Sequence, residues 1–185
     1  KMNKNVEQAS ADLKRLAKIA REAQVDVRGQ ITRLSLDTLS KVGFPGALRQ
    51  FVKSFWSMYD IQAEFCSGQG PSEYSLEAST EVQLLRIVQE AFTNIRKHAN
   101  AQKVHVTLEN LPGKIVLSIE DDGGGFDPTD HAAGRMTFGL RIMSQRAAEM
   151  GGCVTVRSNP GAGTRVVVEV PVSNENRSAY ENPAG

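Results

Sequence analysis

The stretch from residue 80 to residue 119 constrains the fold of this chain most, because two different hydrophobic periods follow each other directly. From Thr80 to Ala99 the apolar residues recur at the spacing of an amphipathic helix. Residues 104–108 and 115–119 instead alternate between apolar and polar, as strands do, and the turn Leu111-Pro112-Gly113 joins them. The segment therefore predicts a long helix followed by an antiparallel β-hairpin.

Local signals set the bounds of the neighbouring elements. Thr80 followed by Gln83 has the pattern of a capping box, and Asn100 suits the left-handed position after a last helical turn. Residues 121–135 are rich in glycine and polar residues, which predicts a loop. Residues 138–150 then have a helical pattern that ends at Gly151. Residues 153–158 and 164–170 predict two more strands, and a frayed tail follows Pro171.

The N-terminal third of the chain has another pattern. Apolar or small residues recur every seventh position from Val6 to Leu34, which predicts a helix over residues 6–36 that packs against a partner helix. The alternative is a helix that lies on its own domain with one apolar stripe. Gly43, Pro45 and Gly46 break this pattern. We therefore expect a second helix over residues 45–59, a strand over 61–66 and a loop over 67–75.

Composition limits the class of protein. With 185 residues, 40% of them hydrophobic, the chain can bury one main core and carry an attached element. A net charge of +1 gives no basic surface for nucleic acid. Cys66 and Cys153 lack metal-ligand spacing, and no apolar run reaches the roughly 20 residues of a membrane span. We expect a cytoplasmic domain without nucleic-acid or membrane contacts, although its parent protein could be anchored in the inner membrane.

Polar residues of mixed chemistry share one face of the helix over residues 80–99. At about 100° per residue, the face opposite the apolar stripe carries Arg86, Glu90, Asn94, Lys97 and His98. A solvated surface is the common explanation for charges on a helix. A carboxylate, an amide, an ammonium and an imidazole in successive turns differ from interchangeable Glu/Lys pairs, however, and they favour a site.

Asp121 ends the second strand of the hairpin in phase with Ile115, Leu117 and Ile119, so its carboxylate is predicted to face the core. A buried carboxylate costs on the order of several kcal/mol unless donors satisfy it, which makes a ligand amino group an attractive partner. The alternative is a turn aspartate that accepts a hydrogen bond from its own backbone. Thr164 is in phase with apolar positions of the last strand, and its hydroxyl is expected to face the same interior.

Three glycine-containing segments accompany these side chains. Residues 123–125 are all glycine and can approach a flat ligand closely, but they match neither a P-loop nor a Rossmann motif. Phe138-Gly139-Leu140 opens a helix whose free N–H groups could face phosphates. Gly161-Ala162-Gly163 makes a tight turn directly before Thr164.

In order along the chain, these segments resemble the motifs of the ATP-binding domain of two-component sensor histidine kinases. Residues 89–99 (QEAFTNIRKHA) resemble the N box, and residues 121–126 (DDGGGF) resemble the G1 box. Residues 138–147 (FGLRIMSQRA) resemble the G2 region, and residues 161–164 (GAGT) the closing GxGT turn. The match runs from about Thr80 to Val170, and its KHA and GLxxM forms look most like the nitrate-sensor subfamily.

This resemblance implies a Bergerat-type fold of the GHKL class, an α/β sandwich in which helices cover one face of a mixed, mostly antiparallel sheet. It also implies ATP and Mg²⁺ as ligands. In that arrangement Asn94 would coordinate Mg²⁺, and Glu90 would organise the metal or act as acid or base. Asp121 would accept the adenine amino group.

The resemblance assigns further residues to the nucleotide. Thr164 would assist Asp121 directly or through water, and Lys97 and Arg135 are candidate phosphate neighbours. The remaining implied contacts come from the glycine turns and the start of the following helix, at Gly123, Gly125, Gly139, Leu140 and Gly163.

The resemblance also implies a domain organisation. Residues 1–40 resemble the second helix of a dimerisation hairpin, residues 41–172 form the ATP-binding catalytic domain, and residues 173–185 are a flexible tail. The three histidines are His98, His105 and His131, and none lies on the N-terminal helix. We therefore expect the phosphorylated histidine on a helix that precedes Lys1, a homodimer in the full-length kinase, and a response regulator as recipient. This chain alone is expected not to phosphorylate itself.

Several alternatives stay open. His98 could serve the site or form a hydrogen bond within the domain, and Thr137, where many relatives have glycine, suits a helix cap. The alternative function is a kinase-inactive or anti-sigma-like GHKL module that binds ATP without kinase output. A purely structural interaction protein would leave Asp121 and Asn94 unexplained.

Overall fold

The computed structural model describes residues 36–68, 76–127 and 134–172, which all belong to one compact unit, Leu34–Gly185. Helices and strands follow each other in this order: α2 (Leu36–Tyr59), β1 (Gln62–Ser67), α3 (Ala78–Asn94), the π-helix η1 (Ile95–Ala99), β2 (Lys103–Leu111), β3 (Lys114–Asp121), α4 (Gly134–Glu149), β4 (Cys153–Ser158) and β5 (Thr164–Pro171). The helix predicted over residues 6–36, most of the predicted 67–75 loop, His131 and the tail lie outside the described residues.

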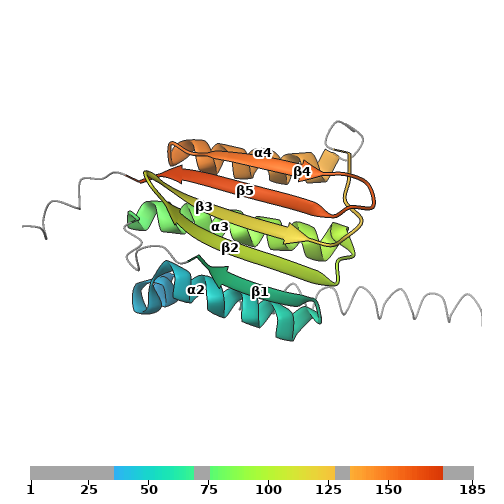
Figure 1. Cartoon of the computed structure of the whole chain (residues 1–185), viewed down its shortest axis with the longest axis horizontal. Helices are drawn as coiled ribbons and strands as arrows, with labels where there is room; N and C mark the ends of the chain where they lie inside the picture. The colour runs from blue at the N-terminus through green and yellow to red at the C-terminus, as the bar shows by residue number, and fades with distance from the viewer. Residues whose placement is uncertain (1–35, 69–75, 128–133, 173–185) are drawn as a thin grey trace, which may run out of the picture. The chain divides into compact units, whose positions relative to one another are not determined.

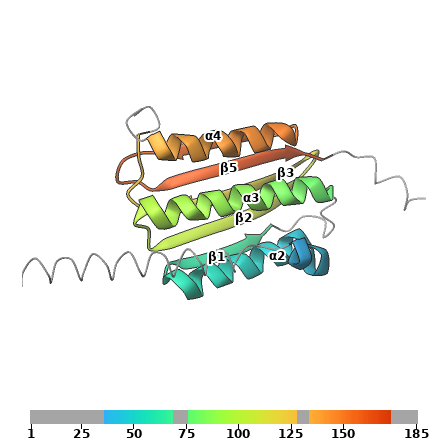
Figure 2. The same ribbon diagram turned by 180° about the vertical axis from the view of Figure 1, so that it is seen from behind.

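The strands form one sheet in the order β1-β2-β3-β5-β4, and the helices cover one of its faces (Figures 1 and 2). β1 pairs with β2 in parallel, and the other three pairs are antiparallel. The predicted mixed, mostly antiparallel sheet with helices on one face is therefore confirmed. β4 spans the predicted residues, while β5 continues one residue further and β1 lies one residue later than predicted.

The hairpin forms where the alternating pattern predicts it. Leu111 pairs with Lys114, so Pro112 and Gly113 make a two-residue turn. Gly113 has a φ of 78°, which this tight connection requires and glycine adopts without strain. β3 consequently places every second residue from Ile115 to Asp121 on the side of the helices.

α2 consists of two helical parts that meet at Gly43, where φ is 67° and ψ is 173°. Pro45 is tolerated because it lies in the first turn of the second part, where its missing N–H has no helical partner. Glu81 of α3 accepts a hydrogen bond from the backbone of Phe44, which satisfies another free donor at this break. The second part ends at Tyr59, as predicted.

The predicted capping box at the start of α3 is wrong. The helix begins at Ala78, its N-cap residue is Glu77, and no side chain caps it. Gln83 is instead used across the helix pair, because its side-chain oxygen accepts a hydrogen bond of 2.7 Å from Arg146 of α4. A tertiary partner thus replaces the local partner that the sequence pattern predicted.

The C-terminal ends of the helices follow the predictions more closely. Asn100 ends η1 in the left-handed conformation with a φ of 51°. α4 begins four residues earlier than predicted and ends in a Schellman motif, in which Gly151 has a φ of 69°. The N–H groups of Gly151 and Gly152 donate to the carbonyls of Ala148 and Ala147, respectively.

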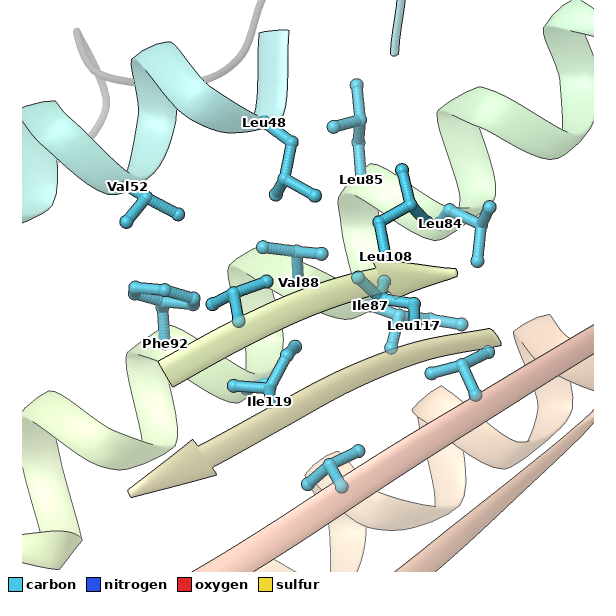
Figure 3. Close-up of a cluster of buried hydrophobic side chains, with 14 of the residues drawn as sticks. Leu48, Val52, Leu84, Leu85, Ile87, Val88, Phe92, Leu108, Leu117 and Ile119 are labelled. Carbon is cyan, nitrogen blue, oxygen red and sulfur yellow. The ribbon is translucent and has the colours of Figure 1, made fainter. Parts of the chain in front are cut away.

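The core lies between the helices and the covered face of the sheet. Figure 3 shows side chains of α2, α3, β2 and β3 that meet in this layer. The ring of Phe92 contacts those of Phe51 and Phe55, with centroids 5.0 and 4.6 Å apart. Burial of a side chain of the size of Phe92 stabilises the fold by about 1.5–3 kcal/mol, and these ring contacts hold α3 against α2. Among the described residues, no helix is both long and apolar enough to cross a membrane.

Candidate functional site

One pocket opens at the end of the sheet where β3 stops and β5 begins. The space between its lining residues, together with the open solvent at its entrance, amounts to about 510 Å³. α3 with η1 forms one wall, α4 forms another, and the strand ends form the floor. The lining residues are Ala91, Asn94, Ile95, His98, Ala99, Ile119, Asp121, Gly125, Phe126, Leu140, Met143, Thr164 and Val166. Most of this surface is apolar, so a flat and largely apolar ligand group fits it best.

Asp121 supplies a carboxylate to this pocket. Its side chain faces the helices, as the alternation along β3 predicted, and only 6% of the residue is exposed. Its Oδ1 accepts a hydrogen bond of 2.9 Å from the N–H of Gly123, and the backbone of Thr164 is a second donor. Asp121 therefore accepts a hydrogen bond from the backbone of its own turn, as one interpretation predicted, and its carboxylate also faces the pocket, as the other predicted.

Burial raises the pKa of Asp121, since the ionised form loses hydration. The hydrogen bond from Gly123 opposes this effect, and the neighbouring charge of Asp122 adds to it. A donor from a ligand would stabilise the ionised carboxylate in the same way as Gly123 does. The site is therefore electrostatically suited to a ligand that brings N–H groups.

Asp122 has the opposite environment. Its Oδ1 accepts hydrogen bonds of 2.8 Å from the N–H groups of Lys103 and Gln102, and it is exposed. The donor of Lys103 contributes most to lowering the pKa of this carboxyl. Asp122 thus ties the end of β3 to the start of β2, while the adjacent Asp121 faces the pocket.

Thr164 and Ser158 extend the polar end of the pocket across the sheet. Asp121 pairs with Thr164 between β3 and β5, and Thr164 pairs with Ser158 between β5 and β4. The hydroxyls of Thr164 and Ser158 lie 3.0 Å apart. Thr164 was predicted to face this interior, and it lines the pocket. Ser158 was missed, because only the strand register brings it beside Thr164.

The glycines predicted to approach a ligand also pack against the protein backbone. A Cβ on Gly123 would collide with the carbonyl of Ala99, and one on Gly125 with the carbonyl of Asn159. Gly163 has a φ of 74°, and its Cβ would collide with the carbonyl of Asp121. Of these three residues, Gly125 lines the pocket. Close packing is thus a sufficient reason for glycine at all three positions. Gly123 packs on Ala99 of η1, while Gly125 and Gly163 pack where the first glycine turn, residues 123–125, meets the second, residues 161–163.

The π-helix η1 joins the polar face of α3 to the first glycine turn. The carbonyl of Ala99, in its last turn, accepts a hydrogen bond of 2.7 Å from the N–H of Gly124. His98 and Ile95 also line the pocket from η1. A π-helical turn at a ligand pocket is a common arrangement, because the wider turn redirects side chains and carbonyls.

α4 brings a second group of predicted residues together. Leu140 and Met143 line the pocket, and Gly139 lies directly against α3. A Cβ on Gly139 would collide with Oε1 of Glu90 and would lie 3.3 Å from Nδ2 of Asn94. Glu90 and Asn94 are therefore neighbours beside Gly139 of α4, and of the two Asn94 lines the pocket.

The structure does not bring all the predicted residues to the pocket. Lys97 is exposed and is not among the lining residues, and Arg86 is exposed on the same helix face. Arg135 lies in the first turn of α4, where only the backbone is described. The apolar lining was not predicted, although Ile119 and Val166 are in phase with Asp121 and Thr164 along their strands.

The donor set allows one specific kind of metal site. Within residues 36–68, 76–127 and 134–172, no three His, Cys, Asp or Glu side chains gather closely enough to hold a metal ion. Asn94, which lines the pocket, and its neighbour Glu90 offer one amide and one carboxylate. This set fits Mg²⁺, which takes oxygen ligands and obtains most of them from phosphates and water in nucleotide sites.

Comparison with known proteins agrees with this geometry. Residues 79–174 match the family described as histidine kinase-, DNA gyrase B- and HSP90-like ATPases. The signal transduction histidine-protein kinase/phosphatase DegS of Brevibacillus brevis is 33% identical over 173 residues, which are 94% of this chain and 44% of DegS. The sensor histidine kinase LiaS of Bacillus subtilis (strain 168) is 32% identical over 163 residues, 88% of this chain and 44% of LiaS. The chain spans less than half the length of these curated relatives.

A solved structure has the same fold. The crystal structure of the ATP binding domain of PrrB from Mycobacterium tuberculosis matches with a TM-score of 0.56 and 22% identity, over 69% of this chain and 92% of that domain. The expected histidine-kinase type of ATP-binding fold is confirmed. The narrower assignment to the nitrate-sensor subfamily stays a prediction.

Proposed function

The chain belongs to the family of histidine kinase-, DNA gyrase B- and HSP90-like ATPases, and we propose that it acts as the ATP-binding catalytic domain of a sensor histidine kinase. The observation that carries this proposal is the buried carboxylate of Asp121 at the polar end of an otherwise apolar pocket. A planar adenine ring suits the apolar walls, and its amino group suits Asp121. Thr164 lies beside Asp121 as a second polar contact for the same edge of the base.

The phosphates and Mg²⁺ would lie toward the first turns of α4. Asn94 and Glu90 would hold the metal there, while Lys97 and Arg135 are the candidate cationic neighbours of the phosphates. The N-terminal end of α4 is attractive for negative charge because its first N–H groups have no helical partner. When bound, Mg²⁺ supplies charge neutralisation of the transferring phosphoryl group.

In this proposal the domain positions the γ-phosphate for attack by a histidine nitrogen outside the ATP-binding fold. Little covalent chemistry is required of the domain, because phosphoryl transfer depends mainly on positioning and electrostatic stabilisation. A response-regulator aspartate would receive the phosphoryl group, and the full-length kinase would be a homodimer. We also propose a cytoplasmic location for this domain, with or without a membrane anchor elsewhere in the parent protein.

Phosphoryl transfer separates this function from the alternative ATP-binding module without kinase output. We expect the full-length protein, incubated with Mg²⁺ and γ-labelled ATP, to gain label that is lost in acid, as a phosphohistidine is. Asp121→Asn should remove the label, while Glu120→Gln, the same chemical change on the exposed side of β3, should keep it. Nucleotide binding without acid-labile label would instead favour the alternative module.

A further inference from the structure

Ser158 carries a buried hydroxyl that has no role in the ATP site as proposed above. It is the last residue of β4 and is 8% exposed. Its Oγ makes three polar contacts, at 2.9 Å to the N–H of Phe126, 2.9 Å to the carbonyl of Gly163 and 3.0 Å to the hydroxyl of Thr164. Two of these partners, Phe126 and Thr164, line the pocket.

The chemistry of the three partners fixes the direction of every hydrogen bond. A serine hydroxyl has one proton and two lone pairs. The Gly163 carbonyl can only accept, so Ser158 donates its proton there. The N–H of Phe126 can only donate, so it uses one lone pair. The contact with Thr164 is then a hydrogen bond only if the Thr164 hydroxyl donates to the second lone pair.

The opposite direction is unfavourable. If Ser158 donated to Thr164, its oxygen would face the carbonyl oxygen of Gly163 at 2.9 Å without a proton between them. The Thr164 proton is therefore held toward Ser158 and away from the pocket. Toward a ligand, Thr164 presents lone pairs alone, as does the ionised carboxylate of Asp121 beside it.

We propose that Ser158 is a positioning residue for nucleobase specificity, which makes the pocket select purines with an amino group at C6 over purines with a keto oxygen there. This inference rests on the proposed function, in which the base of a nucleotide occupies the pocket. An amino group brings two N–H donors to a pair of acceptors. A keto oxygen brings lone pairs against lone pairs, and a site whose polar groups are left unpaired rejects such a ligand.

The test compares the affinities of ADP and IDP, with Mg²⁺, for the wild type and Ser158 variants by calorimetric titration. The two nucleotides share ribose and phosphates and differ at position 6 of the purine and in the proton that hypoxanthine carries on the adjacent N1. Ser158→Ala frees the Thr164 proton to donate to a keto oxygen, so the ADP-to-IDP affinity ratio should fall about fivefold, the equivalent of one hydrogen bond. Ser158→Thr keeps the hydroxyl and should keep the wild-type ADP-to-IDP affinity ratio.

A double-mutant cycle separates positioning from simple support of the glycine turns. Thr164→Val removes the hydroxyl that Ser158 is inferred to orient. If Ser158 acts through Thr164, adding Ser158→Ala to this variant leaves the ADP-to-IDP ratio unchanged. Ser118→Ala is the matched control, because Ser118 is a similarly buried serine on the opposite face of β3, and its ratio should equal that of the wild type.

The outcomes distinguish the two levels of the account. A wild type that binds neither nucleotide contradicts the proposed function, and this inference with it. A wild type that prefers ADP, with a ratio that Ser158→Ala does not change, contradicts this inference alone. The same holds if Ser158→Ala lowers the ratio equally in the Thr164→Val background, because Ser158 then acts without Thr164.

Discussion

Two neighbouring aspartates show how environment divides the roles of identical side chains. Asp121 is the last residue of β3 and is buried, whereas Asp122 follows the strand and is exposed. Burial raises the pKa of Asp121, whereas donors from the start of β2 lower the pKa of Asp122. The first carboxylate is thus costly to keep ionised without a ligand, and the second is stabilised by the fold itself.

We predict that Asp121→Asn is more stable than the wild type at neutral pH. The folded-state pKa of Asp121 is raised, so the folded protein holds this proton more tightly than the unfolded chain does. The contribution of the Asp121 carboxyl to the free energy of unfolding is fully present at low pH. It is lost as pH rises from the pKa of the unfolded chain through the pKa of the folded protein. Urea unfolding at several pH values tests this. The advantage of Asp121→Asn should shrink in acid, and a variant that is less stable at pH 7 would contradict the account.

Asp122→Ala is the matched variant with the opposite expectation. Its folded pKa is lowered, so its stabilising effect is present above the unfolded pKa and is lost as pH falls through the folded pKa. The variant should be less stable than the wild type at pH 7, and the difference should disappear in acid. If the stability of both variants relative to the wild type changed with pH in the same way, the two aspartates would not have the different environments described.

The orientation of a single side chain can be predicted from the sequence where the alternation of its own strand determines it. The orientation of Asp121 followed from alternation, and so did that of Thr164. Ser158 could not be found in this way, because an isolated serine in an alternating run gives no signal. Its position depends on the pairing of β4 with β5, which the sequence of either strand does not specify.

At the scale of elements, the contact between η1 and the glycine turn of residues 123–125 shapes the pocket. The predicted helix over residues 80–99 exists, but its last five residues form a π-helix. Local sequence does not predict this change, because the Ala99 carbonyl is held by Gly124, which lies 25 positions further along the chain. The capping prediction failed for the same reason, since Gln83 is held by Arg146.

Adjacent glycines in this turn should respond differently to alanine. A Cβ on Gly123 would collide with the Ala99 carbonyl, whereas one on Gly124 would lie 3.7 Å from it, an ordinary contact. We expect Gly123→Ala to destabilise the fold by about 1–3 kcal/mol, as overpacking does, and Gly124→Ala to change stability by less than about 1 kcal/mol. Thermal unfolding of both variants measures this. Equal effects of the two substitutions would contradict the packing of this turn on η1.

Gly139→Ala should separate stability from binding. Its Cβ would meet the end of the flexible Glu90 side chain, which can move, and alanine favours the helix by up to about 1 kcal/mol. Stability should therefore change little. The displaced carboxylate should, however, weaken Mg²⁺-dependent nucleotide binding, while binding in excess chelator should stay close to that of the wild type. Unchanged Mg²⁺ dependence would argue against a metal role for Glu90 and Asn94.

At the scale of the whole molecule, the sequence predicted the elements better than their arrangement. Every described strand was predicted to within a few residues, since each has a clear alternating run between turn residues. The parallel pairing of β1 with β2 was not, because it joins segments separated by α3 and leaves no local pattern. The pocket is a product of this arrangement, because its lining residues come from α3, η1, the first glycine turn, α4 and the ends of β3 and β5.

We propose that this pocket binds the adenine of ATP through Asp121. The most direct measurement is calorimetric titration of ADP with Mg²⁺ into the wild type, Asp121→Asn and Glu120→Gln. We predict that the wild type and Glu120→Gln bind with equal affinity, and that Asp121→Asn binds at least about 30-fold more weakly, the equivalent of roughly 2 kcal/mol. Retained affinity in Asp121→Asn, or no binding by the wild type, would contradict the account.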